Sequence, residues 1–155
     1  MTDRPTLVER YREGTRAVDA ALADARDDEL DRAPVDGGWT ARQVAHHLAD
    51  SEAMAYTRLR RLVADPDPVV IQGYDEPRWA ERLHYDRPIG EAVAVVHAVR
   101  AASLALLQSL TEDEWARTGT HSDSGEYSVE RWLEIYAEHP HQHAAQIRAA
   151  RASPR

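Results

Sequence analysis

The chain contains no cysteine, phenylalanine, lysine or asparagine among its 155 residues. Without cysteine it has no disulfide bond, no thiolate metal site and no cysteine nucleophile. A bound metal ion would therefore need histidine or carboxylate ligands. All 19 basic residues are arginine. Together with the missing lysine, asparagine and phenylalanine, this bias indicates a GC-rich coding sequence and says nothing about function.

Positive charge is scarce. Asp and Glu number 27 against 19 basic residues, so the formal net charge is -8. Proteins that bind a phosphate backbone or an anionic lipid surface use clustered positive charge to displace counterions. The balance here excludes that footprint, and we expect neither nucleic acid nor a membrane as a partner.

Long apolar runs are also missing. The first residues, Met1 to Tyr11, are charged and lack the apolar segment of a secretory signal, and no window approaches 18 uncharged apolar residues. The length is close to the usual size of one domain. We therefore expect one domain over residues 1–155, in a soluble cytoplasmic protein.

Apolar residues recur at steps of three and four in four long segments, which is the period of an amphipathic helix. Local signals support the boundaries, because Thr40 with Gln43 forms a capping box, Pro88 suits a first helical turn and Ser128 suits an N-cap. Gly14 weakens the first helix. The predicted helices span residues 7–22, 40–64, 88–110 and 128–150.

The connection between the second and third helices is long. Asp65-Pro66-Asp67-Pro68 cannot continue a helix, and the chain then runs to about Arg87 with one or two helical turns expected at 76–83. Residues 24–36 and 119–127 read as turn or loop, and a further short helical turn follows Thr111. No segment alternates with period two, so no sheet is predicted. The fold class is all-α, a four-helix bundle with a crossover between helices 2 and 3.

Three histidines are candidate metal ligands. His139 and His143 are four residues apart and lie on one helical face, within the apolar stripe, so both imidazoles should point into the bundle core. A cation would satisfy their lone pairs there, although eight histidines can also produce such a pair by chance. His47 lies on the inward stripe of the second helix and is the candidate third ligand. The alternative for His47 is a core histidine that bonds a backbone carbonyl.

The remaining histidines have no such spacing. His46 and His141 are rotated away from the three candidates, so solvent-facing or interfacial positions are expected. His84 and His97 read as ordinary surface or half-buried residues. His121 lies in the polar loop, from which it could reach over a bundle end.

Two other residues lie close to the candidate ligands in sequence. Asp50 follows His47 by three residues and could orient a ligating imidazole, or be a plain solvated aspartate. Pro140 removes a helical hydrogen bond beside His139, so the helix should either end near Glu138 or be reshaped there. The period continuing through Ile147 favours the second outcome.

An ordered set of motifs resembles the DinB/YfiT-like family, and looks closest to its YfiT branch. The resemblance covers roughly residues 36–150. It rests on DGGWTARQVAHHLADS at 36–51, GYDE at 73–76 with Trp79, SLT at 109–111 and HSDSGE at 121–126. It implies an up-down-down-up bundle, with metal ligands at His47, His139 and His143. The family usually has a small residue where Pro140 stands and often an aromatic one where Glu138 stands.

The resemblance leaves the reaction open. Members of the family are regarded as metal-dependent hydrolases, and others as S-transferases that join bacillithiol or mycothiol to electrophiles. Three imidazoles leave a coordination position for water or for a thiolate, and a divalent ion, zinc or nickel, suits them. The sequence shows no clear general base, so we expect a bacillithiol-type thiol S-transferase acting on a small electrophile, as a homodimer. The alternatives are a hydrolase, and a non-catalytic bundle in which the metal staples helices or which serves as a dimerisation module.

Overall fold

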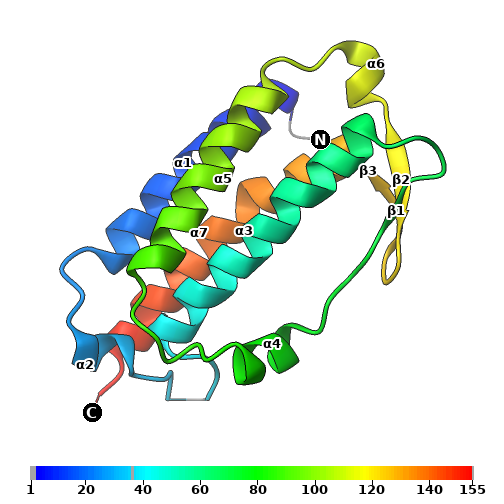
Figure 1. The fold of residues 1–155 in the computed structure, drawn as a ribbon. Helices are drawn as coiled ribbons and strands as arrows, with labels where there is room; N and C mark the ends of the chain where they lie inside the picture. The colour runs from blue at the N-terminus through cyan, green and yellow to red at the C-terminus, as the bar shows by residue number, and fades with distance from the viewer. Residues whose placement is uncertain (1–2, 36, 155) are drawn as a thin grey trace.

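Four long helices carry most of the chain (Figure 1). The computed structural model describes residues 3–35 and 37–154, so Asp36 of the DGGWT motif and the two ends of the expected domain lie outside the described residues. Helix α1 packs along α7, and α3 packs along both α5 and α7. The four helices are α1 (Arg4–Leu22), α3 (Ala41–Ala64), α5 (Gly90–Leu107) and α7 (Val129–Ala152).

The order of directions is up-down-down-up, because α3 and α5 run the same way along the bundle (Figure 1). The chain between them must return along the whole bundle, and it does so through β1 (Val70–Ile71) and α4 (Glu76–Arg82). The prediction of a four-helix bundle with a crossover is confirmed.

The helix boundaries follow the sequence signals closely. Thr40 and Gln43 form the predicted capping box of α3, and the Ser128 hydroxyl accepts a hydrogen bond from the Arg131 amide at the start of α7. Thr111 caps the short helix α6 (Glu112–Trp115) in the same way. Helix α1 begins three residues earlier than predicted, with Asp3 as its N-cap.

A small sheet corrects the prediction that no strand forms. The expected loop folds into a hairpin of β2 (Thr118–His121) and β3 (Gly125–Ser128), and β1 adds to it in parallel, pairing Ile71 with His121. Strands of two to four residues are too short to show period-two alternation. Gly125 supplies the positive φ of 80° that the hairpin turn requires.

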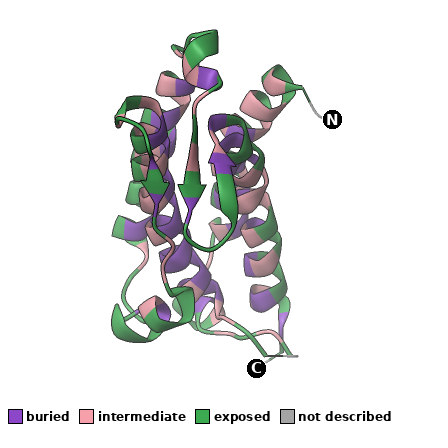
Figure 2. Cartoon of the chain, turned by 90° about the vertical axis from the view of Figure 1, so that its right-hand side faces the viewer, coloured by how far each residue is buried: buried purple, intermediate pink, exposed green. Residues whose placement is uncertain are grey.

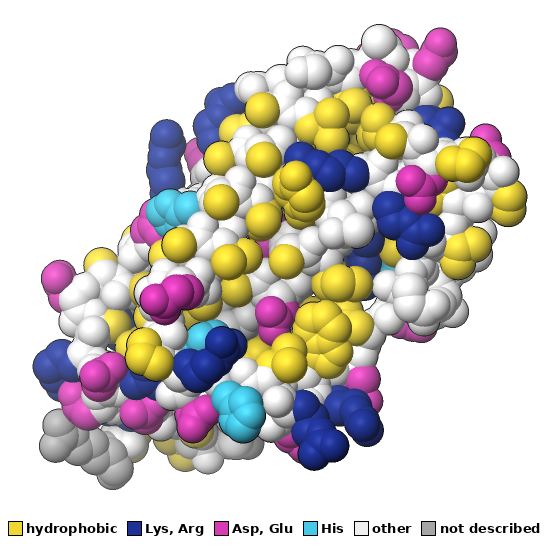
Figure 3. Space-filling model, viewed as in Figure 1, with side chains coloured by type: hydrophobic (Ala, Val, Ile, Leu, Met, Phe, Trp, Pro, Cys, Tyr) yellow, Lys and Arg dark blue, Asp and Glu magenta, His cyan; other side chains and the backbone are white. Residues whose placement is uncertain are grey.

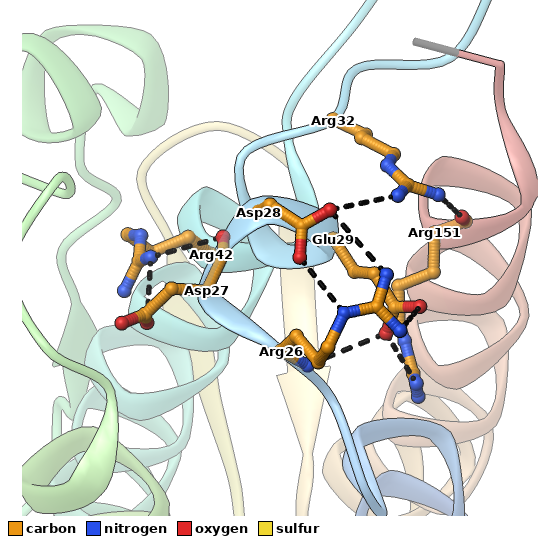
Figure 4. Close-up of polar contacts among 7 residues, drawn as sticks. All are labelled: Arg26, Asp27, Asp28, Glu29, Arg32, Arg42 and Arg151. Carbon is orange, nitrogen blue, oxygen red and sulfur yellow. Dashed lines mark hydrogen bonds and ion pairs between the residues drawn. The ribbon is translucent and has the colours of Figure 1, made fainter.

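The connection after α1 also holds an unpredicted helix, α2 (Asp27–Leu30). Figure 4 shows this turn between arginines of two long helices. Arg42 of α3 bonds Asp27 at 3.1 Å, and Arg151 of α7 bonds Glu29 at 3.0 Å. These ion pairs tie the connection to the end of the bundle.

The apolar core is divided into two clusters of buried side chains. Figure 2 shows where the buried residues lie along the long helices. One cluster includes Tyr11, Leu59 and Trp132, and the other includes Val18 and Leu48. Along α3, α5 and α7 the break between the clusters falls where polar side chains are buried instead. The buried side chains in this polar layer are Glu52 and Arg100, and the half-buried His139 adjoins them.

Helix α7 continues through Pro140 to Ala152, so the prediction that its period carries past the proline is confirmed. The proline ring packs against Gly14 of α1, and a Cβ atom at residue 14 would collide with the Pro140 ring. Gly14 therefore lies within a continuous α1 because it allows close approach of the two helices.

Among the described residues, α5 is the one helix long and apolar enough, by length and composition alone, to span a membrane. It nevertheless carries buried Arg100 and Ser103 on the side that faces the bundle. Figure 3 shows apolar side chains spread along the face that carries α3 and α5, interrupted by charged groups. We therefore treat α5 as a helix of the bundle.

Candidate metal centre

His47 of α3 meets His139 and His143 of α7 in the bundle interior. One nitrogen from each ring lies within 4.8 Å of the others. The Nε2 atoms of His139 and His143 are 3.1 Å apart, and the ring centroids of His47 and His143 are 4.8 Å apart. The structure therefore brings together the three residues that the sequence singles out.

Local structure sets the direction of these rings. The spacing of four residues in α7 puts His139 and His143 on one face, towards α3. The Nδ1 of His143 donates to Gln146 Oε1 at 2.8 Å, which leaves Nε2 with its lone pair facing His139. The indole of Trp39 packs against His47 at 4.8 Å between centroids.

Burial keeps two of the imidazoles neutral. Burial, and after it the neighbouring His143 and His139, lower the pKa of His47 to about 3. The pKa of His143 falls to about 4, mainly through burial and then through His139. A neutral imidazole offers a lone pair, which is the state that binds metal.

Unsatisfied nitrogens test whether a cation fits here. The Nδ1 atom of His47 is buried and has no hydrogen-bond partner among the described residues. The two Nε2 atoms at 3.1 Å cannot both be donors or both be acceptors of one hydrogen bond. A divalent cation accepts lone pairs from all three rings, so this donor set fits zinc or nickel.

Of the histidines outside the candidate ligand set, His46 differs from its predicted position. His46 is 4% exposed and its Nε2 bonds the carbonyl of Arg87 at 3.0 Å. Of the two positions expected for it, solvent-facing or interfacial, the solvent-facing one is therefore wrong. The turn that leads into α5 covers that side of α3. His141 is half-buried against the Arg10 carbonyl, and His97 is exposed beside Asp19. His84 is exposed as expected.

Asp50 bonds a tyrosine, and no hydrogen bond joins it to a candidate ligand among the described residues. Its Oδ2 accepts a hydrogen bond of 2.5 Å from the Tyr85 hydroxyl, and it lines a cavity of about 640 Å³ between α3 and α5. None of the three candidate ligands lines that cavity. Asp50 therefore lies on the side of α3 that Tyr85 covers, in the turn before α5.

Glu52 is the carboxylate that sequence reasoning missed. It is 1% exposed and lies beside His139, with Oε1 at 3.9 Å from Nδ1. It follows His47 by five residues, a spacing that does not suggest a shared face. The available signal was its position between apolar residues on the inward stripe of α3.

A cleft of about 190 Å³ opens beside His139. The crossover and the hairpin form one wall, which brings His121 to the cleft. Burial and the nearby Arg58 lower the pKa of His121. The cleft is lined by Ser51, Arg58, Gly73, Tyr74, Glu76, His121, Asp123, Ile135, Tyr136 and His139.

Comparison with known protein families finds relatives over most of the chain. A model of the DinB superfamily matches residues 10–147. A protein of Oceanobacillus iheyensis named "Putative metal-dependent hydrolase OB0782" is 38% identical over 132 residues, which cover 85% of this chain and 76% of its relative. "Putative metal-dependent hydrolase YfiT" of Bacillus subtilis is 37% identical over 124 residues, 78% of this chain and 68% of its relative.

A solved structure shows the same fold. It is described as "YfiT from Bacillus subtilis is a probable metal-dependent hydrolase with an unusual four-helix bundle topology". Its superposition gives a TM-score of 0.86 at 30% identity, and covers 95% of this chain and 86% of the other. The crossover bundle is therefore shared over nearly the whole chain.

Proposed function

Because this chain belongs to the DinB superfamily, we propose that it is a metal-dependent enzyme that acts on a small molecule, with His47, His139 and His143 as the ligands of one divalent ion. The convergence of three imidazoles within 4.8 Å in a bundle core supports this proposal. An ion held by three imidazoles keeps a coordination position open, where it lowers the pKa of a water or thiol. Zinc and nickel both accept this ligand set.

We propose hydrolysis as the reaction. The observation that carries it is His121, whose imidazole lines the same cleft as His139 and whose pKa is lowered by burial. The Asp123 amide donates to Nδ1 of His121 at 3.2 Å, so the neutral ring keeps its proton on Nε2, which can donate to the leaving group of a substrate in the cleft. The sequence alone offers no clear general base and so favours thiol transfer, whereas the fold brings this proton donor to the cleft.

Thiol transfer is the second candidate, and Arg58 favours it. The Arg58 guanidinium donates to the Tyr136 hydroxyl at 3.0 Å and to the Gln72 carbonyl at 3.2 Å. Within residues 3–35 and 37–154, no carboxylate forms a salt bridge with it. A low-molecular-weight thiol of the bacillithiol type carries carboxylates that Arg58 could bind at the cleft.

One pair of assays separates the two reactions. Metal-loaded protein is given a panel of esters and amides without thiol, and separately a low-molecular-weight thiol with monochlorobimane. We expect ester or amide turnover that metal removal abolishes and that His121→Gln lowers about 100-fold, with the exposed variant His97→Gln as control.

The opposite pattern supports thiol transfer. Turnover would then require thiol, Arg58→Met would raise KM for a carboxylate-bearing thiol, and His121→Gln would have little effect. If neither assay exceeds the rate with free metal, the ion only staples α3 to α7, and metal removal should lower stability alone.

We also propose that the protein is a cytoplasmic homodimer. The outer face of α5 exposes Val95, at 39%, within a row of exposed alanines. Small apolar side chains allow two helices to pack closely. Light scattering should give twice the chain mass, and Val95→Arg should give a monomer. A monomeric parent protein would contradict this proposal.

A further inference from the structure

A buried ion pair lies next to the three histidines but outside the ligand set. Glu52 of α3 is 1% exposed and Arg100 of α5 is 2% exposed, and Arg100 Nη1 donates to Glu52 Oε1 at 2.6 Å. Removing two charges from water costs about as much as the pair gains by its attraction, so such a pair is weak evidence for stability. Its position suggests another role.

Pro140 provides an anchor for the guanidinium. Proline has no N–H, so the carbonyl of Tyr136, four residues earlier, has no donor from the helix backbone at that position. Arg100 Nη1 donates to this carbonyl at 3.3 Å. The sequence predicts that Pro140 reshapes the helix locally. In the structure, the Tyr136 carbonyl that the proline leaves free accepts a hydrogen bond from Arg100 of α5.

Helix α1 holds the same guanidinium from the other side. Arg100 donates through Nε to the Thr15 hydroxyl at 3.1 Å and through Nη2 to the carbonyl of Tyr11. A Cβ atom at Gly14 would lie 2.9 Å from Nη2, so the glycine leaves room for it. Side chains and carbonyls from α1, α3 and α7 thus fix Arg100, and Arg100 fixes Glu52.

Two unsatisfied atoms lie at the end of this chain of contacts. Glu52 Oε2 and His139 Nδ1 are both buried and both lack a hydrogen-bond partner among the described residues. Glu52 Oε1 is 3.9 Å from His139 Nδ1, which is longer than a hydrogen bond. One atom is an acceptor and the other a possible donor, so a hydrogen bond between the carboxylate and the ring would satisfy both.

We propose that the Arg100–Glu52 pair positions His139, with Glu52 accepting the Nδ1–H of the imidazole so that Nε2 presents its lone pair towards His143. Gln146 already does this for His143 at 2.8 Å. A carboxylate acceptor also makes the ring a stronger ligand. The role towards the metal rests on the proposed function, whereas the orientation of His139 does not.

Proton NMR of protein labelled with ¹⁵N-histidine tests the orientation of the His139 ring. It needs no substitution of Arg100 or Glu52. The expected result is one slowly exchanging Nδ1–H assigned to His139, absent in His139→Ala and present in both metal-free and zinc-loaded protein. A His139 that carries its proton on Nε2 in metal-free protein, or that shows no protected ring N–H in either form, overturns the proposal. Failure to bind zinc, with the Nδ1–H still present, overturns only the proposed function.

Metal affinity provides the second readout. The full chain is stripped of metal and titrated with cobalt in competition with a chelator. Glu52→Gln keeps the shape but loses the carboxylate, so cobalt affinity should fall about 10-fold or more and the visible spectrum of bound cobalt should change. Leu59→Ala, a core truncation in the same helix, is the control for lost stability and should leave affinity and spectrum unchanged.

Equal cobalt affinity in Glu52→Gln and the parent protein would contradict the positioning role. If Glu52→Gln does not fold, Pro140→Ala takes its place, because it returns an N–H to the Tyr136 carbonyl in competition with Arg100. It should weaken cobalt binding while both charges remain. An unchanged cobalt affinity in Pro140→Ala would show that the hydrogen bond from Arg100 to the Tyr136 carbonyl plays no part in positioning His139.

Discussion

Pro140 of α7 packs directly on Gly14 of α1, at a point where any side chain on residue 14 would meet the proline ring. Each residue is unfavourable in its own helix, since glycine costs conformational entropy and proline removes a hydrogen bond. Their contact explains both, because the small residue makes room for the ring.

Gly14→Ala should therefore destabilise the protein, although alanine is the better helix former. Forcing one carbon atom into this packed contact should cost about 1–3 kcal/mol, measured as a lower midpoint in urea. Gly90→Ala is the matched control, since a Cβ there meets nothing within 4 Å. If Gly14→Ala and Gly90→Ala both leave the urea midpoint unchanged or raise it, the Pro140 ring has room for a side chain at residue 14.

The metal-free protein should lose stability as the pH falls below about 6.5. Burial lowers the pKa of His47 to about 3 and that of His143 to about 4, whereas in the unfolded chain these rings take up protons near pH 6.5. Between these values the unfolded state binds more protons, so the free energy of unfolding decreases with falling pH, by up to about 1.36 kcal/mol per pH unit for each ring.

Urea unfolding of metal-stripped protein between pH 7 and pH 4.5 measures this slope. His143→Gln should have a shallower slope than the parent, and the comparison cancels the carboxylates common to both. Leu59→Ala should shift the whole curve without changing its slope. A parent-like slope in His143→Gln would mean that this ring is protonated in the folded protein.

The acidic composition predicts that duplex DNA is not a ligand. With a net charge of -8, the protein has no excess of positive charge with which to release counterions from a phosphate backbone. Fluorescence anisotropy with a labelled duplex should show no binding at micromolar protein near physiological salt. Micromolar affinity that weakens as salt is added would contradict this expectation.

The fold could be predicted from local signals because each long helix carries its own. Thr40 with Gln43, Ser128 and the proline-rich stretch after Ala64 mark helix ends that depend on nearby residues alone. The sheet could not be predicted in this way, since β1 pairs with β2 across about 50 residues and each strand is too short for a periodic pattern.

The three histidines could be predicted because helical spacing places two of them on one face and the apolar stripe points them inward. Glu52, Arg100 and Pro140 could not, because their relationship runs across three helices and depends on a carbonyl that the proline leaves free. His121 reaches the cleft only because the hairpin folds back against the bundle.

Metal content of the purified protein tests the central claim most directly. Elemental analysis should find about one divalent ion per chain. His47→Ala and His143→Ala should each lower occupancy or affinity about 10-fold or more, while the half-buried His141→Ala and the exposed His97→Ala retain the metal. If the parent protein binds no divalent ion, or if His47→Ala and His143→Ala bind it as well as the parent does, the three histidines are not a metal site.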